Sequence, residues 1–123
     1  MGSKYGAITK YVDSIGRSVE GRDMPALHLT SGKTKSPLKI YFQCQIHARE
    51  WISGATCMFV VDYFVSKYGV DKYVTELLDS LEVIVVPFTN PDGYVWTWAP
   101  NGDRMWRKNR ATNSGSGCQG LPL

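Results

Sequence analysis

The residues of this sequence best suited to chemistry are His47 and Glu50, which stand three positions apart. They follow an apolar, strand-like stretch at 38–46 and precede a segment with helical spacing from about Ser53. Imidazole nitrogen and carboxylate oxygen both bind zinc at about 2.0–2.2 Å, and a catalytic zinc takes three protein ligands and a water. The pair could therefore supply two of three ligands. A histidine and a glutamate three positions apart also occur by chance. The alternative interpretation of His47 is a polar residue that caps the end of a strand.

The elements that would position this pair follow from the apolar pattern. Residues 38–46 and 81–88 are largely continuous apolar runs, which are typical of interior strands. Between them, residues 53–68 and 71–79 have helical spacing and predict two helices packed on a sheet. Strand, helix, helix, strand is the order of an α/β crossover, so the sequence predicts the α/β fold class.

The flanking segments give weaker signals. Residues 8–19 fit either a helical face or a β-branched strand. Residues 26–30 alternate and predict a short strand with His28 on the face opposite its apolar residues, which favours a surface histidine over a metal ligand. Asn-Pro-Asp-Gly at 90–93 is turn chemistry, and residues 94–98 are expected to continue as an extended segment.

The composition is that of an ordinary globular protein. The chain has 123 residues, 43% of them hydrophobic and 20% charged, and a net charge of +3. We expect one domain, residues 1–123, with a flexible loop and a truncated end within 111–123. So mild a charge suggests neither nucleic acid nor an anionic membrane as partner. No apolar run approaches the roughly 20 residues that span a bilayer, and residues 1–5 contain no apolar signal-peptide core.

Basic residues beside tryptophans near the C-terminal end could in principle stack on single-stranded nucleic acid. The cluster is short and the rest of the chain is not basic, so we expect no nucleic-acid partner. Its members are Arg104, Arg107, Lys108 and Arg110, next to Trp96, Trp98 and Trp106.

Three separated motifs share one register. They are Ile-His-Ala-Arg-Glu-Trp-Ile-Ser at 46–53, Asn-Pro-Asp-Gly-Tyr at 90–94 and Arg-Met-Trp-Arg-Lys-Asn-Arg at 104–110. In this order and spacing the chain resembles the zinc metallocarboxypeptidases of the A/B branch over most of residues 8–120. The resemblance implies a mixed β-sheet with flanking helices, of which this chain would be the N-terminal half of the catalytic domain. It also favours a first strand hairpin whose turn lies at 20–23.

The resemblance assigns roles to four residues. His47 and Glu50 would bind Zn²⁺, which activates water for peptide hydrolysis. Arg107 would polarise the scissile carbonyl, because a guanidinium stays charged and offers paired donors. Arg49 would contact the substrate, which would be the C-terminus of a peptide or protein. The alternative interpretation of Arg49 is an exposed charge at the start of a helix. The resemblance places the third zinc ligand, the general base and the carboxylate clamp further downstream. We therefore expect weak zinc binding and no activity from this chain alone, with a non-catalytic binding or structural fragment as the alternative function.

The resemblance also bears on the cysteines. Cys44 and Cys57 match a cysteine pair of the B-type enzymes, whose bridge would staple the helix to the strand behind the metal loop, and Cys118 would then be unpaired. Such a bridge would agree with the secreted location that the family implies, while three reduced thiols in a cytosolic protein remain the alternative.

Two further expectations concern the C-terminal residues 121–123 and the outer edge of the strand at 38–46. Leu-Pro-Leu at 121–123 departs from the family where an acidic partner of the first histidine is expected, and such a partner orients a ligating imidazole. In the complete enzymes the strand at 38–46 is expected to lie mid-sheet. In this chain its outer edge would be exposed, which would permit self-association.

Overall fold

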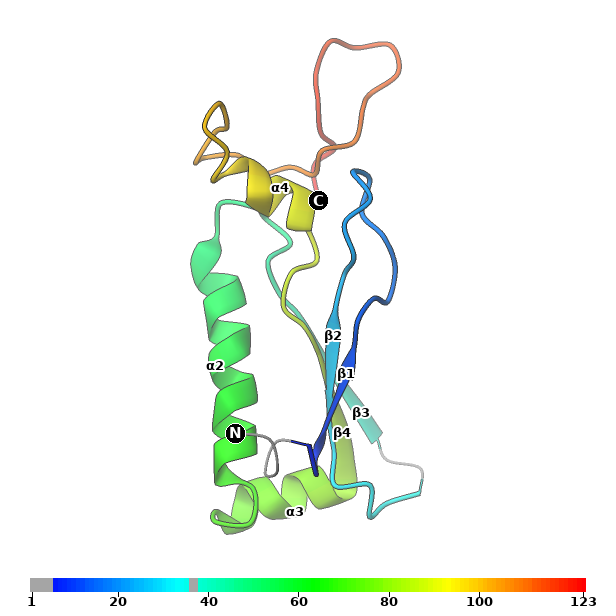
Figure 1. Cartoon of the computed structure of the whole chain (residues 1–123), viewed down its shortest axis with the longest axis vertical. Helices are drawn as coiled ribbons and strands as arrows, with labels where there is room; N and C mark the ends of the chain where they lie inside the picture. Colours follow the sequence, from blue (N-terminus) through cyan, green and yellow to red (C-terminus); the bar gives the residue numbers. More distant parts are fainter. Residues whose placement is uncertain (1–5, 36–37) are drawn as a thin grey trace.

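The computed structural model describes residues 6–35 and 38–123, so the prediction that residues 1–5 contain no signal-peptide core falls outside the described part. The described residues form one four-stranded sheet in the order β1-β2-β4-β3. Helix α2 covers one face of the sheet, and α3 lies across the end where β4 begins (Figure 1). The elements are β1 (Thr9–Val12), β2 (Ala26–Leu29), β3 (Leu38–Gln43), α2 (Trp51–Lys67), α3 (Lys72–Ser80), β4 (Leu81–Val86) and α4 (Pro91–Trp96).

The sheet is mixed, as predicted. β3 and β4 are parallel, with Leu38 opposite Leu81 and Gln43 opposite Val86, and α2 and α3 form the crossover between them. β2 pairs antiparallel with both β1 and β4. The predicted helices at 53–68 and 71–79 and the predicted strand at 81–88 are confirmed within a few residues.

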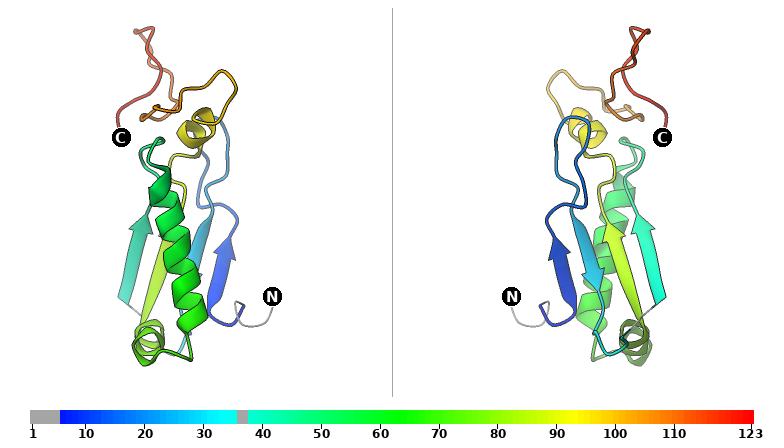
Figure 2. Two further views of the ribbon diagram at one scale, coloured as in Figure 1. Left: turned by 90° about the vertical axis from the view of Figure 1, so that its left-hand side faces the viewer. Right: turned by 90° about the vertical axis from the view of Figure 1, so that its right-hand side faces the viewer.

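The hydrophobic core lies between the sheet and the two longer helices. Because side chains alternate along a strand, Leu29, Val83 and Val85 all face the helices. The helices contribute small and medium-sized apolar side chains, and the core cluster comprises Ile8, Leu29, Cys57, Val61, Val65, Val74, Leu78, Val83 and Val85. No helix lies over the opposite face within the described residues (Figure 2). On that face His28 pairs with Glu82, so His28 is occupied by a carboxylate of the neighbouring strand.

The strand that precedes the candidate site differs from the prediction. β3 ends at Gln43 rather than at residue 46, and it lies at the sheet edge with all six residues exposed. The prediction of an interior strand from the apolar pattern is wrong for this chain, because β4 pairs with one side of β3 and no described strand pairs with the other. The expectation that its outer edge would be exposed is confirmed. The apolar side chains that suggested burial therefore face solvent, as the 82% exposure of Leu38 illustrates.

The first hairpin is confirmed, but its turn lies earlier than predicted. Ser18 accepts from the Gly21 amide and donates its own amide to the Arg22 carbonyl oxygen, at 3.0 and 2.9 Å. The turn therefore spans 18–22 rather than 20–23. Gly21 has a φ of 82°, a left-handed conformation that glycine adopts without a steric cost.

The predicted extended segment at 94–98 is wrong, because residues 91–96 form helix α4. The side chain of Asn90 accepts a hydrogen bond from the Gly93 amide at 3.0 Å, and Pro91 occupies the first helical turn. An asparagine N-cap followed by proline is a helix-start signal as well as a turn signal. The sequence thus begins a short helix where turn chemistry alone was expected.

The predicted disulfide is present between Cys44 and Cys57, whose Cα atoms are 6.4 Å apart, while Cys118 is free and exposed. The bridge joins the residue after β3 to the second turn of α2. It therefore fixes α2 directly behind the loop that carries His47. Across residues 6–35 and 38–123, no helix is long and apolar enough to cross a membrane.

Candidate metal centre

The candidate site lies where parallel strands β3 and β4 end. Residues 44–50 follow β3, and Thr89 and Asn90 follow β4. Two backbone hydrogen bonds join these segments, from Thr89 to the Cys44 carbonyl oxygen at 3.0 Å and from Asn90 to that of Gln45 at 3.2 Å. The crevice outside the carboxyl ends of parallel strands is a general location for binding sites in α/β sheets.

A buried glutamine shapes the loop that carries His47. Gln45 is fully buried and has a φ of 53°, which is uncommon for a residue other than glycine. Its side-chain amide donates to the Ala48 carbonyl oxygen at 2.9 Å, and its side-chain oxygen accepts from the Gly54 amide at 3.0 Å. The Gln45 backbone amide also donates to Ser53 Oγ at 3.1 Å. These bonds hold the loop against the first turn of α2. No motif in the sequence marks Gln45 for this role.

Three of the four predicted site residues lie in contact. His47 Nδ1 is 3.0 and 3.1 Å from the two carboxylate oxygens of Glu50, and Arg107 Nη1 is 3.3 Å from Glu50 Oε1. The His47 side chain is 24% exposed and that of Glu50 is 45% exposed. Arg49 lies in the intervening turn, and its carbonyl oxygen accepts a hydrogen bond from Arg104 Nη1 at 2.9 Å.

The donor atoms fit two positions of a zinc ion. Atoms 3.0 Å apart can both lie about 2.0–2.2 Å from one metal. His47 Nε2 lies 3.1 Å from the Leu123 carbonyl oxygen, so an Nε2–H donor there leaves the Nδ1 lone pair directed at Glu50. A cation between Nδ1 and the carboxylate satisfies both groups. The Leu123 carbonyl thus orients the ring as an acidic partner would. No cluster of three His, Cys, Asp or Glu side chains suited to a metal occurs in the described ranges.

The segment that carries Arg107 is anchored beside the His47 loop. The backbone amide of Ala48, which is fully buried, donates to the Arg107 carbonyl oxygen at 3.2 Å. The side chain of Asn90 donates to carbonyl oxygens of both segments. The two parts of the site, separated by 57 residues at the Glu50–Arg107 pair, are therefore held together by one main-chain hydrogen bond and by the side chain of Asn90.

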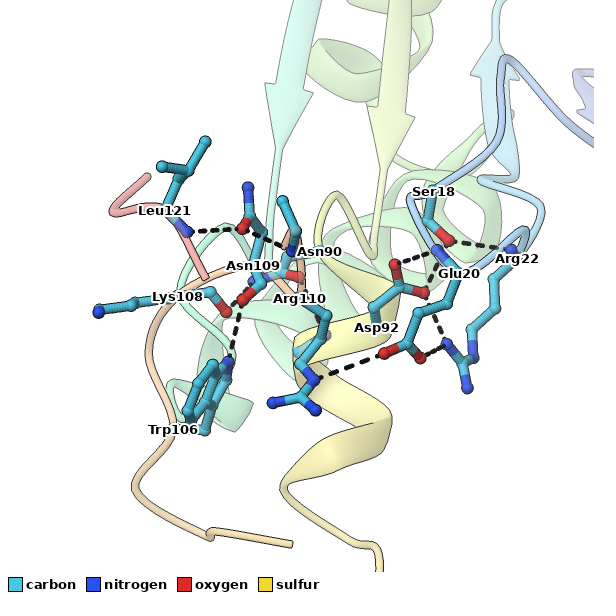
Figure 3. Close-up of polar contacts among 12 residues, drawn as sticks. Ser18, Glu20, Arg22, Asn90, Asp92, Trp106, Lys108, Asn109, Arg110 and Leu121 are labelled. Atoms are coloured by element: carbon cyan, nitrogen blue, oxygen red, sulfur yellow. Dashed lines mark hydrogen bonds and ion pairs between the residues drawn. The ribbon is translucent and has the colours of Figure 1, made fainter. Parts of the chain in front are cut away.

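Asp92 forms a second polar network, which was not predicted because Asn-Pro-Asp-Gly at 90–93 indicates only a turn. The carboxylate is almost fully buried and accepts from Ser18 Oγ at 2.6 Å, the Glu20 amide at 2.9 Å and Arg22 Nη1 at 2.7 Å (Figure 3). Burial raises the pKa of Asp92, but these hydrogen bonds outweigh it and leave the pKa below its ordinary value. Arg110 also pairs with Glu20 at 3.4 Å. The network fastens the first hairpin to α4.

The basic and aromatic residues contact one another. The guanidinium of Arg104 lies 3.6 Å from the ring centre of Trp51, and that of Arg110 lies 4.0 Å from Trp96 and 4.8 Å from Trp106. These cation–π contacts occupy ring faces that a nucleic-acid base would need for stacking.

Comparison with known proteins identifies the family to which this arrangement belongs. The sequence profile described as zinc carboxypeptidase matches residues 1–123. The chain belongs to the zinc carboxypeptidase family. Zinc is therefore the metal that the family implies for the complete enzyme, and the resemblance carried by the three motifs is confirmed.

Individual relatives agree with this assignment. Carboxypeptidase A2 of Rattus norvegicus is 43% identical over 108 residues, which cover 88% of this chain and 25% of the relative. The inactive metallocarboxypeptidase ECM14 of Saccharomyces cerevisiae is 42% identical over 115 residues, covering 91% of this chain and 26% of the relative. The crystal structure of thrombin activatable fibrinolysis inhibitor matches with a TM-score of 0.86 and 35% identity, over 95% of this chain and 28% of that one.

The chain spans about a quarter of the length of the curated relatives that it matches. The predicted α/β fold with a mixed sheet matches the corresponding part of the carboxypeptidase structures.

Proposed function

We propose that this chain carries part of the active site of a zinc metallocarboxypeptidase, which removes C-terminal amino acids from peptides and proteins. In this proposal His47 and Glu50 bind the metal, Arg107 stabilises the oxyanion, and Arg49 contacts the substrate. The observation that supports it is the 3.0 Å approach of His47 Nδ1 to the Glu50 carboxylate, with Arg107 3.3 Å from the same carboxylate. Two metal-binding groups and an oxyanion-stabilising group thus meet at one point.

Each residue has a distinct task. When bound, zinc would lower the pKa of a water molecule and polarise the substrate carbonyl. His47 and Glu50 fix the position of the metal, while Arg107 has to leave Glu50 and donate to the developing oxyanion. Side chains of Arg107 and Glu50 are 46% and 45% exposed, so separating this solvent-exposed pair costs little, about 0–1 kcal/mol.

For the chain on its own, we propose weak zinc binding and no hydrolysis. His47 and His28 are the two histidines of the sequence, and His28 is paired with Glu82. A two-ligand site leaves at least two zinc positions to water, so we expect about micromolar affinity or weaker. Catalysis would require a third ligand and a general base from further polypeptide, and a base alone typically contributes about 10²–10⁴-fold.

A zinc titration combined with a peptide assay tests this proposal. Calorimetry should give about micromolar or weaker zinc binding, which His47→Ala abolishes and His28→Ala, the matched control, preserves. A peptide with a free C-terminus and its amidated counterpart should both remain intact. Nanomolar zinc binding, or binding that depends on His28, contradicts the two-ligand site. Metal-dependent release of a C-terminal residue by this polypeptide would contradict the proposal that the isolated chain is inactive.

The second candidate function is a non-catalytic fragment that associates with a partner. The exposed outer edge of β3 favours it, since unpaired strand groups and apolar side chains promote pairing. The relative ECM14 is itself described as an inactive metallocarboxypeptidase. We propose that isolated chains self-associate through β3.

The Cys44–Cys57 bridge further supports secretion or another oxidising compartment.

A further inference from the structure

Asn90 lies at the point where three segments of the site meet. The residue is 4% exposed, and its side chain makes three hydrogen bonds of 3.0 Å. The side-chain oxygen accepts from the Gly93 amide and caps α4. The side-chain nitrogen donates one hydrogen to the Ile46 carbonyl oxygen. It donates the other to the carbonyl oxygen of Lys108, which is labelled beside Asn90 in Figure 3.

The two acceptors are neighbours of functional residues. Ile46 directly precedes His47, and Lys108 directly follows Arg107. One amide group therefore spans the loop that carries the metal ligands and the segment that carries the arginine. The Ala48 amide adds a direct link to the Arg107 carbonyl oxygen at 3.2 Å, so the junction consists of three donors directed at three carbonyl groups.

Asparagine is specifically suited to this position. An amide supplies two N–H donors and an acceptor, and here all three are used. Aspartate and serine cap helices about as well as asparagine, but neither can donate to both carbonyls. The space is also closed, because a Cβ atom on Gly93 would lie 2.6 Å from Asn90 Nδ2 and 2.8 Å from the Ala48 Cβ.

We propose that Asn90 is a positioning residue, which sets the placement of Arg107 relative to the His47–Glu50 pair through the Ile46 and Lys108 carbonyls. It contacts neither metal nor substrate. This inference rests on the proposed function, since it concerns the geometry of the same site. Its cap on α4 is a separate role, and the variants below preserve that cap.

A double-mutant cycle with zinc as the probe tests the inference. Removing the guanidinium with Arg107→Gln should tighten zinc binding several-fold, because Glu50 loses its cationic partner. Asn90→Ser should weaken zinc binding about tenfold, the lower end of effects seen for groups that orient metal ligands. In the Asn90→Ser background, Arg107→Gln should change zinc affinity less than twofold, because the arginine is no longer held against Glu50. Asn101→Ser, which alters an exposed asparagine, is the matched control and should leave both effects intact.

A purely structural role predicts a different result. Asn90→Ser would then lower the free energy of unfolding, while folded molecules would bind zinc normally and respond to Arg107→Gln as the wild type does; that outcome overturns the inference. If Asn90→Ser does not fold, Asn90→Asp replaces it in the cycle, and the same two outcomes support or overturn the inference.

Amide hydrogen exchange separates failure of this inference from failure of the proposed function. In Asn90→Ser the Ala48 amide should exchange about tenfold faster, whereas the β4 amide of Val83 should keep its wild-type protection. If the wild type binds no zinc, the proposed function fails, yet this measurement still tests the junction. Unchanged exchange at Ala48 overturns the positioning role.

Discussion

Replacing Asp92 by asparagine should remove much of the attachment between the first hairpin and α4. The carboxylate accepts three hydrogen bonds, from Ser18, Glu20 and Arg22, and its side chain is only 4% exposed. Ser18 and Arg22 donate to one oxygen and the Glu20 amide to the other. Asparagine keeps one oxygen and loses the charge, so at least one bond is lost and the remaining ones are no longer charge-assisted. Bonds to a charged group contribute about 1.5–3 kcal/mol each. Because the Arg22 side chain is 36% exposed, its share lies at the low end, and we expect a total loss of about 3 kcal/mol at pH 7.

The same substitution should show a defined pH dependence. The hydrogen bonds that lower the pKa of Asp92 below its ordinary value of 3.8 stabilise the ionised folded state. Its contribution is therefore fully present above the unfolded pKa and is lost as pH falls through the folded pKa. The stability difference between wild type and Asp92→Asn should accordingly be smaller at pH 3 than at pH 7.

Urea unfolding with the disulfide intact measures both quantities. Asp62→Asn, which alters an exposed carboxylate on α2, is the matched control and should change stability by at most about 0.5 kcal/mol. A loss below about 1 kcal/mol at pH 7 would show that the network stabilises the fold less than charge-assisted hydrogen bonds should. A loss equally large at pH 3 would show that the charge of Asp92 is not the cause.

Three further predictions concern packing and association. Cys57→Ser should cost at least about 3 kcal/mol in urea unfolding, since it removes a bridge with a sequence separation of 13 and places a hydroxyl in the core. Reduced wild type, which keeps an apolar thiol at this position, should unfold at a slightly higher urea concentration than the variant. Tyr41→Lys on the β3 edge should reduce self-association in sedimentation measurements, whereas Tyr73→Lys, on the exposed surface of α3, should not; equal effects would exclude β3 as the interface. Gly93→Ala should cost about 1–3 kcal/mol because the new Cβ would lie 2.6 and 2.8 Å from two neighbouring side chains. Gly117→Ala, in open space, should cost far less in the same unfolding measurement.

The long elements could be predicted because their residues repeat one pattern over several turns or strand positions. Helix α2 buries Cys57, Val61 and Val65 at four-residue spacing, and β4 presents an apolar run to the core. Helix α4 could not be distinguished from a turn, because six residues give too little periodicity and Asn-Pro serves both structures. The exposed edge of β3 was expected from the family resemblance, but it could not be predicted from the apolar pattern. The apolar side chains of a strand indicate that its faces can be buried. They do not indicate whether another strand will pair with each of its edges.

The residues of the candidate site also fall into two groups, those that the sequence predicted and those that it did not. His47, Glu50 and Arg107 could be found from motifs that follow one another in register, and the structure brings them into contact. Gln45 and Asn90 could not be identified, because their roles arise from hydrogen bonds to main-chain groups. Those groups carry no sequence signal, and for Asn90 they lie 44 and 18 residues away in the chain. The residues that we propose for the chemistry can be recognised by their type and motif, whereas those that we propose to position them can be recognised only from their tertiary contacts.

This division bears on what zinc contributes to the protein. The hydrogen bonds of Gln45 and Asn90, together with the Ala48–Arg107 link, order the metal loop without any metal ligand taking part. In proteins whose site forms only with metal, the binding free energy is spent on folding. Here the loop is already ordered by buried amides, so little of that free energy is needed to order it. The affinity of this chain for zinc should therefore reflect the number of ligands it offers, and a weak site would not imply a disordered one.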